Sequence, residues 1–322
     1  MLKKLHACLA GLLLAAAAGA WAQSAYPHQP IKLMVPWPPG GGVDTTARMI
    51  SEPLAQRLGQ PIVIDNRGGA GGNIGTEVAA RMKADGYNLL MGSISPNAVN
   101  VHLHGRLGFD PLKDFTPIVY VSSVPNILVV PANSPFKTVK DVVDFAKANP
   151  GKLNYASGGV GSSQHLAAVQ FMQVAKVDLL HVPYKGTAPA EADVVAGHVS
   201  LMLDTTTCLP FIAGGKMRAL AVASKKRNPA LPNVPTFDEE GLPGIYASSW
   251  YGLMAPAGLP RPVLDKLNAE ANAVLKSPDF QKRMVDFGAE IGGGTPEDFG
   301  NFIASEIKRY ESIVKASGAR IE

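Results

Sequence analysis

The sequence predicts an α/β protein built from two doubly wound lobes that are joined by crossing strands. Three observations carry this prediction: a repeated alternation of short apolar strands with helical patterns, a glycine-rich turn after a strand in each half, and a strand pattern that occurs twice. Short apolar runs separated by helical patterns are typical of a parallel sheet covered on both faces. We therefore expect one such sheet in each half of the chain.

The first alternation begins at Ile31. Strand patterns stand at IKLMVP (31–36), PIVIDN (61–66) and YNLLMGS (87–93). The intervening segments, PGGGVD (39–44) and RGGAGGN (67–73), each lead into a helical pattern, the first to about residue 58 and the second to about residue 84. Pro53 lies inside the first pattern and should kink this helix or mark its restart.

The second alternation repeats this order. Strand patterns stand at KLNYAS (152–157), LLHVPY (179–184), SLMLD (200–204) and MRALAVAS (217–224), and the turn SGGVGSSQ (157–164) opens a helical pattern that ends near residue 174. A further helix is expected near residues 188–196. The second half is therefore also predicted to be doubly wound.

A repeated pattern indicates where the chain passes between the lobes. ILVVPANSPFKTV (127–139) resembles YGLMAPAGLPRPV (251–263), with Pro131 and Pro135 matching Pro256 and Pro260 at a constant offset of 125 residues. We interpret the two as equivalent crossing strands, which makes lobe 1 discontinuous (23–125 and 251–322) and lobe 2 continuous (126–250). Two unrelated strands stopped by prolines are the alternative. Crossing strands are a natural hinge, since few dihedral angles must change to close the lobes.

The segment from Pro262 onward is predicted to be helical and to pack on lobe 1. Its last helix should begin at Thr295 as N-cap, with Pro296 in the first position and Asp298 three residues after the cap. No residue in this tail has an evident chemical role.

Residues 1–22 are predicted to be a signal peptide. Lys3 and Lys4 precede an apolar run, and a small-x-small pattern places the cleavage after Ala22. Cleavage removes Cys8 and leaves Cys208 as a lone cysteine, which we expect to be buried. It also lowers the formal net charge from +4 to +2, that is 28 basic minus 26 acidic residues. Such a small charge does not indicate a nucleic-acid partner.

The two glycine-rich turns are candidate anion sites, because backbone amides at a helix N-terminus bind anions without a cationic side chain. Neither turn carries the lysine of a nucleotide-binding loop. In the first turn glycines allow a ligand to approach the backbone, and Asp44 or Thr45 can cap the helix. The candidates are Trp37, Pro39, Gly40, Gly41 and Gly42 in the first turn, and Gly161, Ser162 and Ser163 in the second.

Further candidates stand where strands end. Ser93 and Ser95 follow YNLLMG, Tyr184 follows LLHVP, and Asp204 ends SLMLD. Parallel sheets place ligand groups at these ends. Asp204 can accept a bond from a ligand or hold water, or it can cap the turn at residues 205–207.

Other chemistries have weaker support. Ser162 or Ser163 with His165 would make a secreted serine hydrolase, but the GxSxG elbow fails because His165 occupies its last position. Asp65 is placed like the ribose-binding acid of a dinucleotide fold, yet the preceding turn does not complete GxGxxG. His102 and His104 would face one side of a strand, without a third metal ligand nearby. We expect no metal and no cofactor.

Five segments together resemble one family. VPWPPGGGVDTTAR (35–48), VIDNRGGAGGNIGTEVAA (63–80), NYASGGVGSSQHL (154–166), HVPYKGTAPA (181–190) and LMLDTT (201–206) are similar to the Bug receptors, the extracytoplasmic solute-binding proteins of tripartite tricarboxylate transporters. The resemblance covers the chain from Tyr26 to its C-terminus. Each motif is weak alone, but their common order is specific.

The resemblance implies a type II periplasmic binding protein that closes on a small mono- or dicarboxylate, without catalysis. It implies that the carboxylate is held by residues 37–42 and 161–163, by Asp204 and by ordered water. It further implies a periplasmic monomer whose membrane partner is a pair of permease subunits or a sensor receptor. Trp37, Pro38 and Pro39 make the first turn bulkier than the Phe or Tyr followed by Ala that is common in the family.

Overall fold

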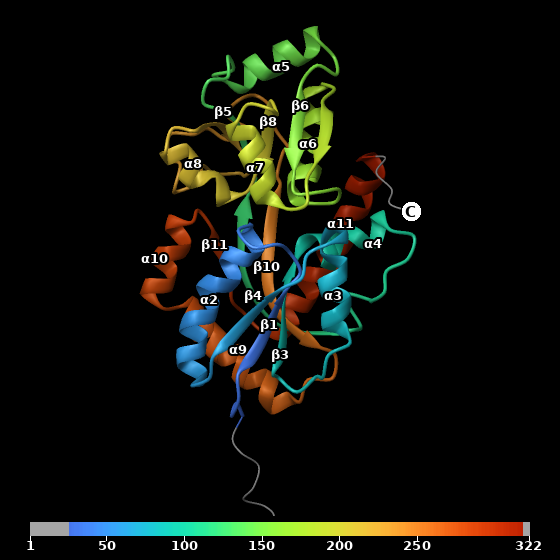
Figure 1. The fold of residues 1–322 in the computed structure, drawn as a ribbon, viewed down its shortest axis with the longest axis vertical. Coiled ribbons are helices and arrows are strands. Elements are labelled where there is room, and N and C mark those ends of the chain that lie inside the picture. Colours follow the sequence, from blue (N-terminus) through green and yellow to red (C-terminus); the bar gives the residue numbers. More distant parts are fainter. Residues whose placement is uncertain (1–25, 318–322) are drawn as a thin grey trace, which may run out of the picture.

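The protein has two lobes stacked along its long axis, each with its own sheet (Figure 1). The computed structural model describes residues 26–317. The predicted two-lobed α/β fold is confirmed, and the predicted signal peptide lies outside the described residues. Within the described part of the chain, no helix has the length and apolar character needed to cross a membrane.

The sheet of lobe 1 has six strands in the order β11-β4-β10-β3-β1-β2. Their bounds are β1 (Ile31–Val35), β2 (Ile62–Asn66), β3 (Asn88–Ser93), β4 (Phe115–Pro125), β10 (Ser248–Pro256) and β11 (Glu290–Ile291). The first three pair in parallel, with Leu33 opposite Ile64 on one side and Leu89 on the other.

The sheet of lobe 2 has five strands in the order β7-β6-β8-β5-β9. Their bounds are β5 (Ile127–Pro131), β6 (Asn154–Ser157), β7 (Leu180–Pro183), β8 (Leu201–Asp204) and β9 (Met217–Val222). Here β6, β7 and β8 are parallel. The strands of each predicted alternation are mutually parallel, whereas the crossing strands β10 and β5 run antiparallel to both of their neighbours.

The two antiparallel strands are the pair that the internal repeat indicated. β5 lies between β8 and β9, and β10 lies between β3 and β4, so the two strands occupy equivalent positions in the two sheets. Leu128 pairs with Leu203, and Leu253, 125 residues later, pairs with Met91. β4 continues through Asn126 into β5, so β4 and β10 run side by side between the lobes (Figure 1). The lobe boundaries at residues 125/126 and 250/251 stay a prediction.

Helices cover both sheets. Lobe 1 carries α2 (Gly42–Leu58), α3 (Asn73–Ala80), α4 (Asn100–Leu103), α9 (Arg261–Leu275), α10 (Pro278–Asp286) and α11 (Pro296–Ser317). Lobe 2 carries α5 (Val139–Ala148), α6 (Ser163–Ala175), α7 (Thr187–Val195) and α8 (Leu209–Ala213). Short helical turns occupy η1 (Ala70–Gly72), η2 (Ser95–Val99) and η3 (Thr206–Cys208).

Most predicted helices match these bounds. α2 runs through Pro53 as one helix, so the helix does not restart there, and α3 ends four residues earlier than expected. α11 begins with the predicted cap: Thr295 Oγ1 accepts from the Asp298 amide at 3.1 Å, and the Asp298 carboxylate accepts from the Thr295 amide at 2.9 Å.

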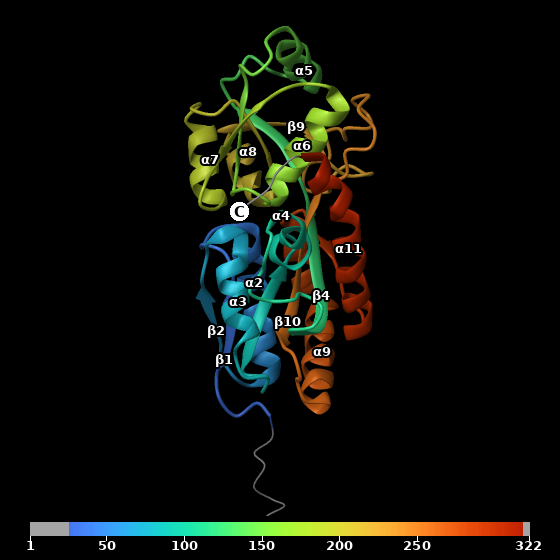
Figure 2. The ribbon, with the colours of Figure 1, turned by 90° about the vertical axis from the view of Figure 1, so that its right-hand side faces the viewer.

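One helix of lobe 2 is anchored in lobe 1. Leu166 of α6 is 1% exposed and packs in a cluster whose other buried members, among them Ile94, Leu103 and Met254, lie on the six-stranded sheet of lobe 1 or on the segments packed against it. α11 rises from lobe 1 along one side of the molecule and reaches α6 (Figure 2). The lobes therefore share an apolar contact beside the crossing strands.

Candidate functional site

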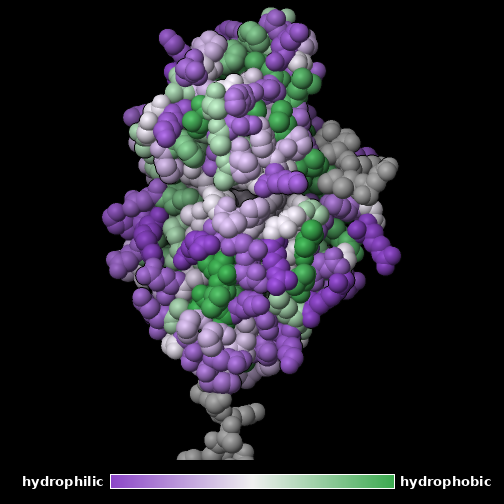
Figure 3. All heavy atoms as spheres, in the orientation of Figure 1, coloured by the Kyte–Doolittle hydropathy of each residue, from purple (hydrophilic) through white to green (hydrophobic). Residues whose placement is uncertain are grey.

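A cavity lies between the two lobes. On the face shown in Figure 3 the lobes meet along a narrow seam with a small hollow in it. Lobe 1 contributes Trp37, Pro38, Gly41, Gly42, Val43, Ser93, Ile94 and Ser95 to the cavity wall, and lobe 2 contributes Ser162, Ser163, Gln164, Gly186, Thr187 and Thr205. The crossing strand β10 adds Ser249 and Tyr251.

The first glycine turn is held in place by Asp44. Its carboxylate accepts from the Gly40 amide at 3.0 Å, from Arg48 Nε at 2.9 Å and from Asn66 Nδ2 at 2.9 Å. Asn66 also donates to the Trp37 carbonyl at 3.0 Å. Burial alone would raise the pKa of Asp44, but the donors from Arg48, Gly40 and Asn66 outweigh it and lower the pKa. Asp44 is therefore ionised, and its hydrogen bonds fix the conformation of the turn.

The amides at the start of α2 remain available to a ligand. Gly41 is the N-cap, and Asp44 stands in the third helical position, so the expectation that Asp44 or Thr45 occupies the N-cap position is wrong. Within the described residues the amides of Gly42 and Val43 have no protein acceptor, and both residues line the cavity. Free amides at a helix N-terminus favour an anion.

The second turn presents a similar helix start from lobe 2. Ser162 is the N-cap of α6, and its Oγ accepts from the His165 amide at 3.3 Å. This leaves the Ser163 and Gln164 amides without a protein acceptor in the described part of the chain, and both residues line the cavity. Ser163 Oγ is likewise free to bind a ligand. The cavity thus receives two helix N-termini, one from each lobe.

Six of the predicted residues line the cavity: Trp37, Gly41, Gly42, Ser93, Ser162 and Ser163. Trp37 Nε1 donates to Ser93 Oγ at 3.1 Å, so the indole orients this hydroxyl. Ser95 also lines the cavity. The ligand-binding role of these residues stays a prediction.

Five predicted residues do not line it: Pro39, Gly40, Gly161, Tyr184 and Asp204. Pro39 is exposed, and Gly40 lines a neighbouring groove. Tyr184 Oη donates to the Asp193 carboxylate at 2.5 Å. These placements give them no direct contact with the cavity.

Gly161 instead shapes the contact between the lobes. Its φ is +80°, and a Cβ there would lie 2.5 Å from Leu103 Cδ1 and 3.0 Å from Asn100 Oδ1 in lobe 1. Only glycine combines this backbone conformation with so close an approach. Gly161 therefore allows the second turn to fit against α4.

Asp204 lies beneath the cavity wall, completely buried. Its Oδ1 accepts from the Thr205 amide at 2.7 Å, and Thr205 lines the cavity. Burial and the neighbouring Glu191 carboxyl raise the pKa of Asp204 well above its usual range. The Asp204 carboxyl therefore does not reach the cavity itself, but it holds the backbone of Thr205, which lines the cavity.

The sequence reasoning missed several hydroxyl groups on the wall. Thr187 and Thr205 begin the segments that follow β7 and β8, a position that could have indicated them. Ser249 and Tyr251 lie on β10, and only the return of that strand between the lobes brings them to the cavity. Gln164 follows the two candidate serines and donates to Thr187 Oγ1 at 3.1 Å.

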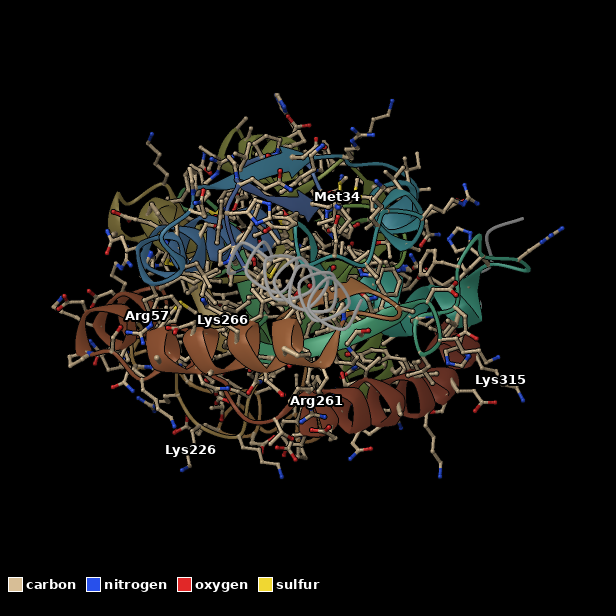
Figure 4. The ribbon with its side chains drawn as sticks, turned by 90° about the horizontal axis from the view of Figure 1, so that it is seen from below. Met34, Arg57, Lys226, Arg261, Lys266 and Lys315 are labelled. Atoms are coloured by element: carbon tan, nitrogen blue, oxygen red, sulfur yellow. The ribbon has the colours of Figure 1, made fainter. Side chains whose placement is uncertain are left out.

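No lysine, arginine or histidine of the described chain lines this cavity. In the view of Figure 4 the labelled Lys226 and Lys315 lie at the edge of the molecule, whereas Met34 lies among other side chains. Charge on a bound anion must therefore be balanced by amides and hydroxyls.

The serine–histidine pair of the hydrolase hypothesis is not assembled. Ser162 Oγ contacts the backbone amide of His165, and the His165 ring accepts from the Gly161 amide through Nδ1 at 3.2 Å. The ring stacks on His181 with centroids 4.4 Å apart. Burial, followed by the neighbouring His181, lowers the pKa of His165 to about 4.

The other alternative residues lie apart from the cavity. Asp65 bonds to Arg67 and Lys32 at the surface. His102 lies in α4 and His104 directly after it, so they do not share a strand face. The His102 ring contacts the Ile307 carbonyl at 2.7 Å, and the His104 ring contacts Asn73 at 3.2 Å. Cys208 is buried, as expected.

Sequence comparison places the chain among known receptors. Residues 46–319 match the family model described as tripartite tricarboxylate transporter family receptor. The chain is 41% identical to a Pseudomonas sp. (strain P51) protein, the UPF0065 protein in the tcbD-tcbE intergenic region, over 90% of this chain and 87% of that protein. It is 36% identical to Protein BugT of Bordetella pertussis, over 92% of each.

Solved structures agree with this. A protein from R. palustris with adipate superposes with a TM-score of 0.89 at 36% identity, covering 92% of this chain and all (100%) of that one. MatC from Rhodopseudomonas palustris with bound malate gives 0.84 at 34% identity, covering 90% and 100%. With a family model that spans most of the sequence and relatives matched along nearly their whole length, the chain belongs to the tripartite tricarboxylate transporter family of receptors, also represented by the Bug proteins.

Proposed function

We propose that this receptor captures a small carboxylic acid in the cavity between its lobes and delivers it to the permease subunits of a tripartite tricarboxylate-type transporter in the membrane. A sensor receptor is the alternative recipient. The observation that carries the proposal is the pair of helix N-termini, α2 from lobe 1 and α6 from lobe 2, that present free amides to one cavity.

The free amides and hydroxyls of the cavity wall can supply the free energy that binding of an anion requires. Hydrogen bonds to a charged group contribute roughly 1.5 to 3 kcal/mol each. Four or five of them give a gross energy of roughly 6 to 15 kcal/mol, a range that includes the roughly 8 kcal/mol of micromolar binding. Each helix dipole adds only about 0.3 to 1 kcal/mol, so direct bonds from amides and hydroxyls dominate. Because each lobe supplies about half of the donors, the acid binds well only when the lobes are closed.

The relatives support a carboxylate as the ligand class. Adipate and malate are named as the ligands of two of the similar structures. We extend this class to the present cavity because it has donors for an anion on both lobes. Which mono- or dicarboxylate is bound depends on the wall formed by Trp37, Ile94 and Tyr251.

Capture is tested with protein purified from the periplasm without denaturation. Native mass spectrometry should identify any acid carried through purification. Calorimetry and thermal shift against a panel of mono- and dicarboxylates should then give a micromolar or tighter ligand. If no acid in the panel binds protein from which endogenous ligand has been removed by unfolding and refolding, the proposal is wrong.

Delivery needs a separate test. Transport of the identified acid should require the receptor gene together with the two permease genes. If uptake persists without the permeases while an acid-induced transcriptional response is lost without the receptor, a sensor is the partner.

A further inference from the structure

Two acidic side chains lie together beneath the lobe 2 wall of the cavity. Asp204, at the end of β8, is 0% exposed, and Glu191, in the middle of α7, is 4% exposed. Their carboxyl groups lie within hydrogen-bonding reach of each other. Burying two carboxylates side by side in the ionised form is strongly unfavourable.

Each carboxyl keeps one oxygen without a donor. In the described part of the chain Asp204 Oδ2 and Glu191 Oε1 have no hydrogen-bond partner when both groups are ionised. A buried acceptor without a donor costs free energy, and most such atoms in proteins are paired. One proton held between the two groups supplies the missing donor.

Among residues 26–317, no lysine, arginine or histidine is one of the groups that shift the pKa values of this pair. The titratable groups next to it are the Cys208 thiol from the segment after β8 and the Tyr251 phenol from β10. The other neighbours are uncharged: Thr207, and Gln164 from α6. A proton is therefore the available positive charge.

We propose that Asp204 and Glu191 share one proton, and that the singly protonated pair positions Thr205 and Gln164 for ligand binding on the lobe 2 wall. The proposal rests on the proposed carboxylate-binding function and adds a regulation to it. Asp204 holds the Thr205 backbone directly, and both Thr205 and Gln164 line the cavity.

The consequence is a binding affinity that depends on pH. Loss of the shared proton places a second negative charge beneath a cavity that must hold an anion, so affinity falls as pH rises. A single linked proton changes the dissociation constant by up to about tenfold per pH unit above the pKa of the pair. His165 and His181, whose pKa values are lowered to about 4, do not titrate in this range.

The first test needs no ligand. Infrared spectra of the full-length mature protein at pH 7 should contain a carbonyl band from a protonated carboxyl group. Glu191→Gln should remove this band, because the glutamine amide donates to Asp204 and leaves it ionised. Glu306→Gln is the matched control: Glu306 is a buried glutamate on α11 that pairs with Arg309, and its variant should keep the band. Absence of the band from the wild type would overturn the proton site.

The second test measures calorimetric dissociation constants for the acid found by the panel between pH 6 and pH 10. The wild type and Glu306→Gln should lose affinity toward alkaline pH. Glu191→Gln has the same net charge as the singly protonated pair and should bind with a nearly constant affinity. A flat wild-type profile, or the same slope in Glu191→Gln, would overturn the coupling. A band at pH 7 in a protein that binds no acid would instead contradict only the proposed function.

Discussion

The phenol of Tyr251 fills the space that any side chain at Gly42 would need. A Cβ built on Gly42 would overlap Tyr251 Oη and lie 3.1 Å from Cζ. Tyr251 is 1% exposed and is held between β3 and β4, so it cannot retreat easily. The crossing strand and the first glycine turn are therefore fitted to each other at the cavity wall.

Gly42→Ala should weaken ligand binding by at least tenfold. The added methyl group forces Tyr251 or the start of α2 to move, and overpacking of this kind costs about 1 to 3 kcal/mol. The shift displaces the amides of Gly42 and Val43, which we expect to contact the carboxylate. Calorimetry with the identified acid measures the loss.

The neighbouring glycine supplies the control. A Cβ on Gly41 would lie 3.5 Å from Thr187 Oγ1, which is ordinary contact, so Gly41→Ala should retain the stability of the wild type. Tyr251→Phe removes the overlapping hydroxyl and should partly restore binding in Gly42→Ala. If Gly42→Ala binds like the wild type, the fit between the two residues has no role in binding.

Leu166→Ala should favour the open form of the receptor. Leu166 of α6 is buried in the lobe 1 cluster, and truncation of a buried leucine costs about 2 to 5 kcal/mol in the state that buries it. Opening the lobes would expose this side chain, so the substitution destabilises the closed form relative to the open form. Affinity should drop at least tenfold, and small-angle scattering with ligand should show a larger radius of gyration.

Leu203→Ala is the matched control, because Leu203 lies in the core of lobe 2. It should lower the free energy of unfolding without changing the scattering profile of the liganded protein. Equal radii for liganded Leu166→Ala and wild type would show that this contact does not control closure.

The sequence predicted the parts of the fold that local patterns specify. Short apolar runs gave the strands, and the repeat at residues 127–139 and 251–263 gave the crossing strands, because strands in the same environment have similar residues. The antiparallel direction of β5 and β10 was missed, since an apolar run carries no information about the direction of its neighbours.

The site was predicted less completely for a related reason. Glycine turns are visible in sequence because their geometry demands glycine, and Gly41, Gly42, Ser162 and Ser163 do reach the cavity. Tyr251 reaches it only because β10 returns to lie between β4 and β3. Asp204 was placed in the cavity by its position at a strand end, but its carboxyl turns inward to Glu191, a contact between distant segments. Long-range contacts of this type leave no local pattern.

Ser162→Ala and Ser163→Ala should have different effects. Ser162 Oγ caps α6, and losing an N-cap costs about 0.5 to 2 kcal/mol of stability. Ser163 Oγ has no protein partner in the described chain, so Ser163→Ala should leave stability unchanged and weaken binding. Together the two substitutions should weaken binding at least tenfold. Urea unfolding and calorimetry separate the two quantities, and unchanged affinity in the double variant would remove the second turn from the site.

The free energy of unfolding should pass through a maximum near pH 6.5. Burial lowers the pKa values of His165 and His181 to about 4, from 6.5 in the unfolded chain. The folded state therefore binds fewer protons between these values, and the stability from the neutral rings is lost as pH falls from 6.5 to 4. The raised pKa of Asp204 acts oppositely, since its stabilising proton is lost as pH rises through the folded pKa.

Below pH 6.5 the two histidines outweigh the shared proton, so the free energy of unfolding rises with pH. Above pH 6.5 loss of the shared proton lowers it as pH rises, and the raised pKa of the buried Cys208 thiol adds to this fall toward pH 9. Urea unfolding from pH 4 to pH 9 should show both limbs. His165→Asn should reduce the acid limb, whereas His198→Asn, at an exposed histidine, should not. Glu191→Gln should flatten the alkaline limb, because the glutamine amide replaces the proton as the donor to Asp204. If stability still falls toward alkaline pH in Glu191→Gln, the fall is caused by the titration of another group.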